Sequence, residues 1–207
     1  MEAIIEKLDL SKADKNYYTA RKEPRLVDLD SYYYLTISGK SSPESSLFIE
    51  AIEKLYSVAY SIKFICKAED MDFVVPKMEG YWWIDGGFDA QHKFTETPPS
   101  EWNWKIAIRM PDFVEGDHFY RATRKLESKQ KPAKDVKYEL LNEGLSVQVL
   151  HIGSYEEEEP NIMAMMNFMN QNGLEVNGYH HEIYLSDPRK TSPEKLKTIL
   201  RYAVRKK

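Results

Sequence analysis

The distribution of hydrophobic residues indicates the same order of elements twice along the chain. Each half begins with a strand-like stretch that ends at a glycine and continues with an amphipathic helix. An aromatic strand with Gly-Tyr at or near its start follows, and then a strand of alternating hydrophobic and polar residues. The corresponding segments are residues 31–39, 41–62, 78–85 and 102–110 in the first half, and residues 145–153, 156–173, 178–184 and 198–204 in the second half.

The predicted helices rest on hydrophobic residues that recur every three or four positions. In the first half they run from Phe48 to Ile62, after a start signal at residues 41–44 that combines capping serines with a proline. In the second half they run from Ile162 to Met169, and Asn172-Gly173 ends the helix. A further helix over about 115–127 is expected to connect the halves.

Two strand–helix–strand–strand units predict an α+β fold with pseudo-two-fold symmetry. An antiparallel sheet would carry its helices on one face, and a central ligand cleft would lie between the units. Residues 1–30 are predicted to be an extended lead-in with a short strand at 25–28, and the polar stretch 86–101 a lid or a loosely ordered loop. We expect one domain over residues 1–207, with repeat one at about 25–111, a connecting helix and linker at about 112–135, and repeat two at about 136–207.

Composition narrows the class of protein. The 207 residues are 42% hydrophobic and 13% aromatic, which is enough for a sizeable core. A net charge of -4 argues against direct nucleic-acid binding and against binding to anionic membranes. The single cysteine, Cys66, excludes an internal disulfide and is expected to be a buried thiol in a helix. Residues 1–7 lack the apolar run of a signal peptide, so we expect a cytoplasmic protein; its oligomeric state is left open.

Glu182 is the main candidate for a functional residue. It lies in a predicted central strand, in which His180, Glu182 and Tyr184 share one face. The opposite, more apolar face, with His181 and Ile183, is expected to be covered by helices, which leaves Glu182 on the open face near the junction of the repeats. A carboxylate among aromatic rings is desolvated, so it attracts cations or acts as a base. The alternative is an ordinary solvated carboxylate on an exposed sheet face.

Aromatic residues accompany this carboxylate. Trp82 and Trp83 are adjacent in one strand, so one of them must face away from the helices and needs a cover. Further candidates for ligand contacts are Glu79, which precedes the aromatic residues of the same strand, and Tyr33, Tyr56 and Trp104, each of which has core packing as its alternative.

The sequence predicts no metal site and no cofactor. His180 and His181 are adjacent in a strand, so they point to opposite faces and cannot both bind one ion. Motifs for phosphate, dinucleotide or zinc-protease sites are lacking. The acidic run Glu156–Glu159 before Pro160 is interpreted as the first turn of a helix, where carboxylates face the positive end of the helix dipole; the alternative is an acidic metal or partner site.

Several ordered motifs resemble those of the stand-alone GyrI-like small-molecule-binding proteins. The resemblance covers the chain from about residue 15 to its end. The motifs are Leu35–Lys40, Leu55–Phe64, Met78–Trp83, Ile106–Pro111, Gly153–Tyr155 and Glu182–Pro188.

The resemblance implies a cleft similar to the drug-binding site of multidrug-sensing regulators, with Glu182 as the buried glutamate that receives flat, often cationic ligands. Residues 1–30 are too short for the DNA-binding module of those regulators. Some members of the family hydrolyse cyclopropane-bearing DNA-alkylating compounds. By that analogy Glu182 would activate water, Tyr184 or Tyr56 would hydrogen-bond the developing phenolate, and Trp82 or Trp83 would stack on the ligand.

Three functions remain open at this point. The first is a detoxifying hydrolase of cyclopropanoid toxins. The second is a binding module that sequesters planar drugs without turnover, or that inhibits a partner such as DNA gyrase. The third is a structural protein with a vestigial cleft.

Overall fold

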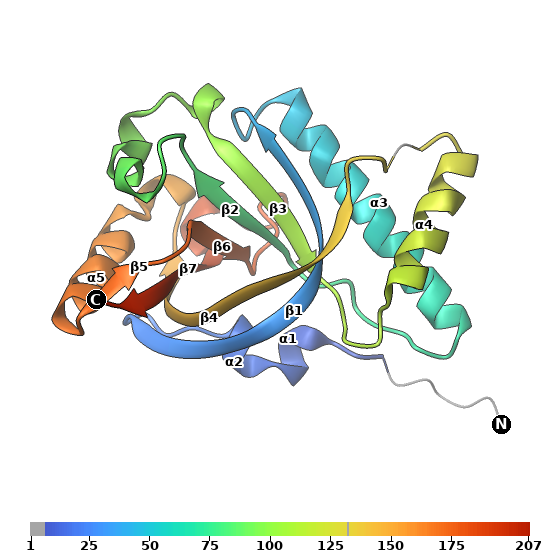
Figure 1. Cartoon of the computed structure of the whole chain (residues 1–207), viewed down its shortest axis with the longest axis horizontal. Helices are drawn as coiled ribbons and strands as arrows, with labels where there is room; N and C mark the ends of the chain where they lie inside the picture. The colour runs from blue at the N-terminus through green and yellow to red at the C-terminus, as the bar shows by residue number, and fades with distance from the viewer. Residues whose placement is uncertain (1–6, 132) are drawn as a thin grey trace.

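The computed structural model describes residues 7–131 and 133–207, except for the side chain of Asp89. The start of the predicted lead-in, residues 1–6, and Pro132 of the predicted linker lie outside the described residues. Helices and strands are mixed along the chain, and the strands form one continuous curved sheet (Figure 1).

Within the described residues, the sheet contains six main strands and a short edge strand. The strands are β1 (Arg25–Lys40), β2 (Met78–Trp83), β3 (Asn103–Arg109), β4 (Lys137–Ile152), β5 (Leu174–Val176), β6 (His180–Tyr184) and β7 (Lys197–Lys206). The helices are α1 (Leu10–Ala13), α2 (Lys15–Tyr18), α3 (Ser46–Ala68), α4 (Gly116–Ser128) and α5 (Glu159–Gln171).

Antiparallel pairing closes the sheet into a barrel. The strand order is β4-β1-β3-β2-β6-β7-β5, and an additional pairing of β4 with β7 joins the two ends of the main sheet. The repeats meet at two places: β1 pairs with β4, and β2 pairs with β6. The predicted α+β fold with two strand–helix–strand–strand repeats is therefore confirmed, and β5 is a short strand that the hydrophobic pattern did not indicate.

The predicted helix signals hold with small shifts of boundary. The helix α3 begins at Ser46 rather than in the stretch 41–44, because the Ser45 side chain accepts a hydrogen bond from the Phe48 backbone N–H at 3.2 Å. The helix α5 ends at Gln171, directly before the predicted stop signal Asn172-Gly173, and Gly173 adopts a φ of 64°, which glycine tolerates without steric cost.

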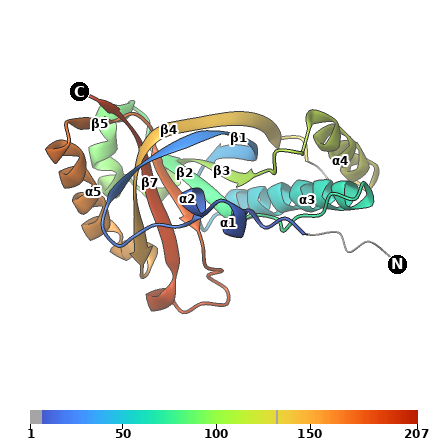
Figure 2. The ribbon, with the colours of Figure 1, turned by 90° about the horizontal axis from the view of Figure 1, so that it is seen from below.

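Two helices pack against one face of the sheet and enclose separate cores. Residues of α3, among them Leu55 and Ile62, pack on Trp82, Trp104 and strand residues of the first repeat. Met165 and Met169 of α5 pack on β4 and β7. Figures 1 and 2 show α3 and α5 on opposite sides of the barrel, with α4 beside α3.

The opposite face of the sheet is covered by the N-terminal segment. Tyr17 and Tyr18 of α2, with Leu10 of α1, pack against Ile183 and Ile199. Asp9 and Asp14 cap the two short helices by accepting hydrogen bonds from backbone N–H groups. The prediction of an extended lead-in is thus wrong for residues 10–18, whose helices are too short to show a hydrophobic period.

The burial of β6 differs from the prediction. The face that carries Glu182 is the one on which α3 and α5 pack, because Glu182 pairs with Gly80 and Leu200, and Leu200 belongs to the core under α5. The face that carries His181 and Ile183 is covered by α1 and α2. Alternation alone could not show that both faces are covered.

The polar stretch 86–101 is folded onto the barrel. It forms the 3₁₀ turns η1 (Phe88–Glu96) and η2 (Pro99–Glu101). The Phe94 ring stacks on Trp102 at a centroid distance of 4.4 Å, and the Gln91 amide hydrogen-bonds both the N–H and the carbonyl of Ile84. These contacts fix the stretch to the end of β2.

Cys66 is buried in α3, as predicted. Burial, and then the nearby Glu69 carboxylate, raise the pKa of its thiol to about 11, so the thiol stays protonated at neutral pH. None of the helices in the described part of the chain is both long enough and apolar enough to span a bilayer.

Gly39 provides a test of the packing between β1 and β3. A Cβ added at Gly39 would overlap the indole of Trp104, which is 1% exposed. We expect Gly39→Ala to lower the free energy of unfolding by ~1–3 kcal/mol, because the buried ring cannot move freely. Gly116→Ala is the control: nothing lies within 4 Å of its added Cβ, so we expect no loss. Urea denaturation of both variants measures the difference, and equal stabilities would contradict the packing.

Candidate functional site

Three titratable side chains meet on the face of the sheet that carries α3 and α5. The Nε2 atom of His180 lies 3.1 Å from Oε1 of Glu182 and 3.5 Å from Oε2 of Glu158. His180 and Glu182 come from β6, and Glu158 lies between the turn η3 (Tyr155–Glu157) and α5. We call Glu158, His180 and Glu182 the Glu182 cluster. Its side chains are only 7–12% exposed.

The proton affinities of this cluster are set by burial and by mutual charge. Burial and the neighbouring Glu182 carboxylate raise the pKa of Glu158 to about 7. Burial disfavours a charged His180, but Tyr202 and the two carboxylates outweigh it and hold the pKa of His180 well above its ordinary value. The cluster therefore favours positive charge between its carboxylates.

Aromatic side chains surround the cluster. The Trp82 Nε1–H donates to the Tyr184 hydroxyl at 3.0 Å, and the Tyr155 ring lies edge-on to Tyr184 at 5.8 Å. Burial and the Glu182 charge raise the pKa of Tyr184 well above its ordinary value. The same two causes raise the pKa of Tyr155 to about 12. Both phenols are therefore protonated at neutral pH and are available as hydrogen-bond donors.

A glycine makes room for this arrangement. Gly80 of β2 lies directly opposite Glu182 in the β2–β6 pair, and an added Cβ at Gly80 would lie 2.6 Å from the Tyr184 hydroxyl. In the same pair Trp82 lies opposite His180. The cluster thus sits at the interface of the two repeats, with one strand from each.

Four of the residues singled out from the sequence come together here: Glu182, His180, Tyr184 and Trp82. Trp83 does not join them, because alternation turns it to the other side of β2, where it stacks on Tyr179 at 4.7 Å.

The remaining candidates lie elsewhere. Trp104 shares the face of Trp82 but is 1% exposed and packs edge-on to Phe48. Tyr33, in the middle of β1, stacks on Tyr138 at 4.8 Å. Tyr56 of α3 packs against Tyr60. For these three residues the contacts are those of packing within the protein.

Glu79 lies on the opposite face of the sheet from Glu182, because it pairs with Ile183 rather than with Glu182 or His180. Its side chain is fully buried, and its Oε2 accepts from the Tyr17 hydroxyl at 2.5 Å and lies 3.0 Å from His181 Nε2. His181 Nδ1 in turn lies 2.8 Å from Glu143, to which Arg201 donates at 3.0 Å. We call Glu79, His181, Glu143, Arg201 and Tyr17 the Glu79 network.

Sequence reasoning missed two members of the site, Glu158 and Tyr155. The acidic run was expected to face the helix dipole, and Glu159 does lie in the first turn of α5. Glu158 instead turns inward to His180. Tyr155 belongs to the Gly153–Tyr155 motif, which carried the family resemblance but no assigned role.

The Glu182 cluster also has the composition of a metal site. One ligand atom from each of its three side chains lies within 4.8 Å of the other two. The expectation of no metal site rested on the histidine spacings and on placing the acidic run in a first helical turn, whereas the fold brings Glu158 of that run to His180 and Glu182.

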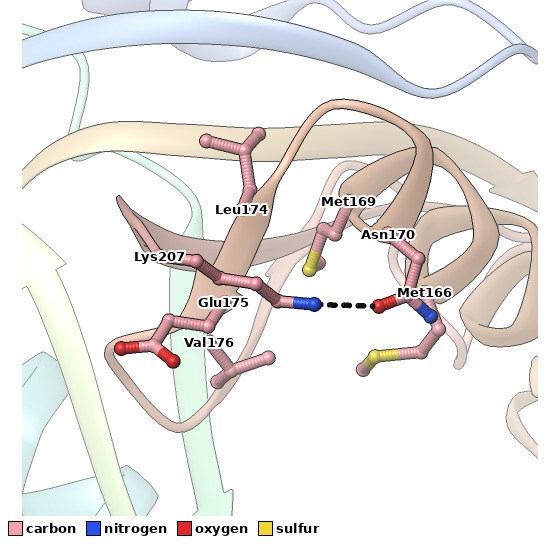
Figure 3. A pocket seen from close by; sticks show the side chains of 7 residues that line it. All are labelled: Met166, Met169, Asn170, Leu174, Glu175, Val176 and Lys207. Atoms are coloured by element: carbon pink, nitrogen blue, oxygen red, sulfur yellow. Dashed lines mark hydrogen bonds between the residues drawn. The ribbon is translucent and has the colours of Figure 1, made fainter.

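Two surface hollows of the described residues lie away from this cluster. Figure 3 shows one at the edge strand β5, between Met166, Asn170 and Lys207, whose Nζ donates to the Asn170 side chain at 3.3 Å. Its volume of ≈ 190 Å³ is below the ~300–1,000 Å³ of drug-sized ligand pockets. A second hollow of ≈ 160 Å³ lies between α3 and α4.

Comparison with known proteins assigns the family. Residues 22–205 match the model of the GyrI-like small-molecule-binding domain. The chain belongs to the GyrI-like family. This membership confirms the resemblance seen in the sequence and supports small-molecule binding by this chain. Comparison with curated proteins gave no match.

Several solved structures are similar to this chain. An uncharacterized conserved protein from Listeria innocua is 35% identical, with a TM-score of 0.87, over 96% of this chain and 100% of that chain. A Listeria innocua protein described as a hydrolase is 34% identical, with a TM-score of 0.85, over 97% of this chain and 100% of that chain. The C-terminal domain of EcmrR shares the fold at 13% identity, with a TM-score of 0.55, over 89% of this chain and 98% of that chain.

The Glu79 network is expected to make the stability of the folded protein fall at acid pH. Burial opposes the charge on Glu143, but His181 and Arg201 outweigh it and lower its pKa from 4.5 to about 2. A lowered carboxyl pKa stabilises the fold above the unfolded-state value. We expect this stabilisation, about 3 kcal/mol, to disappear as the pH falls from 4.5 toward about 2.

Glu143→Gln tests this prediction, since the amide cannot titrate. We expect the variant to be less stable at neutral pH and to lose less stability than the wild type on acidification. Thermal unfolding across that pH range measures the two slopes, and Glu53→Gln, an exposed position on α3, serves as the control. Parallel curves for wild type and Glu143→Gln would contradict the prediction.

Proposed function

We propose that this GyrI-like protein binds flat hydrophobic or cationic small molecules at the Glu182 cluster and hydrolyses strained electrophiles of the cyclopropanoid class. The observation that supports this most is the position of Glu182, a largely buried carboxylate that faces a second acid at the repeat interface, beside the rings of Trp82, Tyr155 and Tyr184.

The electrostatics favour a cationic or electron-poor ligand. Glu158 and Glu182 share only one imidazole between them, so the surroundings carry excess negative charge when both acids are ionised. A flat cation gains both from these carboxylates and from the π-faces of the aromatic rings. Since the side chains of the cluster are only 7–12% exposed, a ligand reaches them by displacing a neighbouring side chain such as Tyr155, which is 38% exposed.

Hydrolysis follows from the same groups. Water attacks the strained ring carbon while Glu182 accepts a proton from that water. The ring C–C bond breaks, and its electron pair moves to the dienone oxygen to give a phenolate. The protonated Tyr184 hydroxyl donates a hydrogen bond to that oxygen. Ring strain drives the step, and general base assistance supplies ~10²–10⁴-fold. The 34% identity to the Listeria protein described as a hydrolase supports turnover in this chain.

A non-catalytic drug-binding module is the second candidate. The shared fold with the EcmrR C-terminal domain is the observation that favours it. Such a module would use the same cluster to hold a planar ligand without releasing a product.

Removal of the central charge tests ligand binding. We expect Glu182→Gln to weaken binding of the planar cation proflavine about tenfold, which corresponds to ~1.4 kcal/mol, because the amide offers no charge. Quenching of tryptophan fluorescence measures the binding. Glu53→Gln removes an equal charge on the exposed side of α3 and should bind like the wild type. Equal affinity for wild type and Glu182→Gln would place the ligand elsewhere.

Turnover separates the two candidate functions. The protein is incubated with an excess of a spirocyclopropyl dienone, and ring-opened product is quantified by chromatography. We expect more product than protein, and a loss of at least about a hundredfold in rate for Glu182→Gln, since general base catalysis contributes this much. If each protein molecule instead holds one molecule of the compound and no product accumulates, the protein is a sequestering module.

A further inference from the structure

We infer that the Glu182 cluster is a binding site for a divalent transition-metal cation such as Zn²⁺, held by carboxylate oxygens of Glu158 and Glu182 and by Nε2 of His180. This inference goes beyond the proposed function, and it does not depend on turnover.

The spacing of the ligand atoms fits a tetrahedral ion. Zinc binds imidazole nitrogen and carboxylate oxygen at about 2.0–2.2 Å, so two ligands of a tetrahedron lie roughly 3.3 Å apart. The Nε2 atom of His180 lies 3.1 Å from Glu182 Oε1 and 3.5 Å from Glu158 Oε2. All three ligand atoms lie within 4.8 Å of one another. The two separations measured from the imidazole nitrogen therefore match those of a tetrahedral ion.

The charges of the cluster also fit a divalent ion. When the His180 imidazole is neutral, the ionised carboxylates of Glu158 and Glu182, which are only 7% and 12% exposed, give the buried cluster a charge of -2. Such a pair is costly unless it is neutralised. A divalent cation balances it fully, whereas one proton on His180 balances only half.

An unpartnered atom gives a second, independent indication. The Oε1 atom of Glu158 is buried and has no hydrogen-bond partner within residues 7–131 and 133–207. The other oxygen of this carboxylate already faces His180 Nε2. A bound ion would neutralise the charge of the whole carboxylate, for which the described residues supply a partner at only one of the two oxygens.

The donor set narrows the class of ion. One imidazole and two carboxylates suit Zn²⁺, Co²⁺, Mn²⁺ or Fe²⁺ better than Ca²⁺ or Mg²⁺, which prefer oxygen ligands alone. Three protein ligands leave a fourth position open, as in zinc sites that bind water or a substrate. The rings of Tyr155, Tyr184 and Tyr202 adjoin the cluster.

The metal and the organic cation would compete for the same carboxylate. Glu182 is a ligand in this inference and the charged contact in the proposed function. We therefore expect Zn²⁺ to lower the apparent affinity for proflavine in the wild type.

Isothermal titration of the full-length, metal-stripped protein with Zn²⁺ tests the inference. We expect saturable binding of one ion, with at least about tenfold weaker binding in Glu158→Gln and in His180→Gln, because each removes a ligand. Glu156→Gln is the matched control: it removes the same charge from the same acidic run, but its side chain is exposed and outside the cluster. It should bind Zn²⁺ nearly as the wild type does.

Co²⁺ provides a readout that does not depend on affinity. A tetrahedral site with one nitrogen and oxygen ligands gives intense visible absorption, which Glu158→Gln should weaken and Glu156→Gln should keep. Circular dichroism and thermal unfolding without metal show whether each variant is folded. The inference is overturned if the wild type binds no Zn²⁺, or if Glu158→Gln and Glu156→Gln bind it equally. Zinc binding without proflavine binding would refute the proposed function and leave the metal site standing.

Discussion

The pairing of β2 with β6 is the interaction on which the site depends. It joins one strand of each repeat and places Gly80 opposite Glu182 and Trp82 opposite His180. Because side chains alternate along both strands, this register brings Glu182, Tyr184 and Trp82 to one face and sends Glu79 and His181 to the other. A shift of one residue would exchange the two sets, so the register of this pair and the chemistry of the site are inseparable.

The two faces of this strand pair differ in how well their buried charges are balanced. Behind β6, the Glu79 network is buried under α2 and contains partly compensating charges, with His181 between Glu79 and Glu143. Removing one partner from a network of this kind is costly, because it leaves a buried charge without its counter-charge. In front of β6, the charges of the Glu182 cluster are less well compensated, as the raised pKa of Glu158 shows. A site that attracts a positively charged ligand is expected to have such uncompensated negative charge on the face that binds the ligand, and balanced charges on the face behind it.

A single physical feature thus unites the functions considered for this protein. Two carboxylates and one imidazole are packed together at low exposure, so any positive charge that enters between them is stabilised. A proton, a metal ion and a flat organic cation differ in size and geometry, and in the proposed function the flat one would also contact the surrounding rings of Tyr155, Tyr184 and Trp82. Membership of the GyrI-like family supports small-molecule binding in general.

Much of the fold was determined by local sequence. The helical period of α3 and α5, the Asn172-Gly173 stop and the strand of Glu182 were all recognisable, because periodicity and capping depend on neighbours in the chain. The grouping of His180, Glu182 and Tyr184 on one face followed from the two-residue period of a strand. The order of elements in the two halves likewise indicated the two repeats that the barrel contains.

Contacts between distant segments decided the rest. Glu158 reaches His180 across more than twenty residues of chain, so the acidic run alone could not reveal that one of its members turns inward. The helices α1 and α2 are too short for a period, and only their packing on Ile183 shows that the second face of the sheet is covered. Likewise, the choice of Trp82 over Trp83 came from the register with β6, since alternation says that the two rings oppose each other but not which faces the cluster.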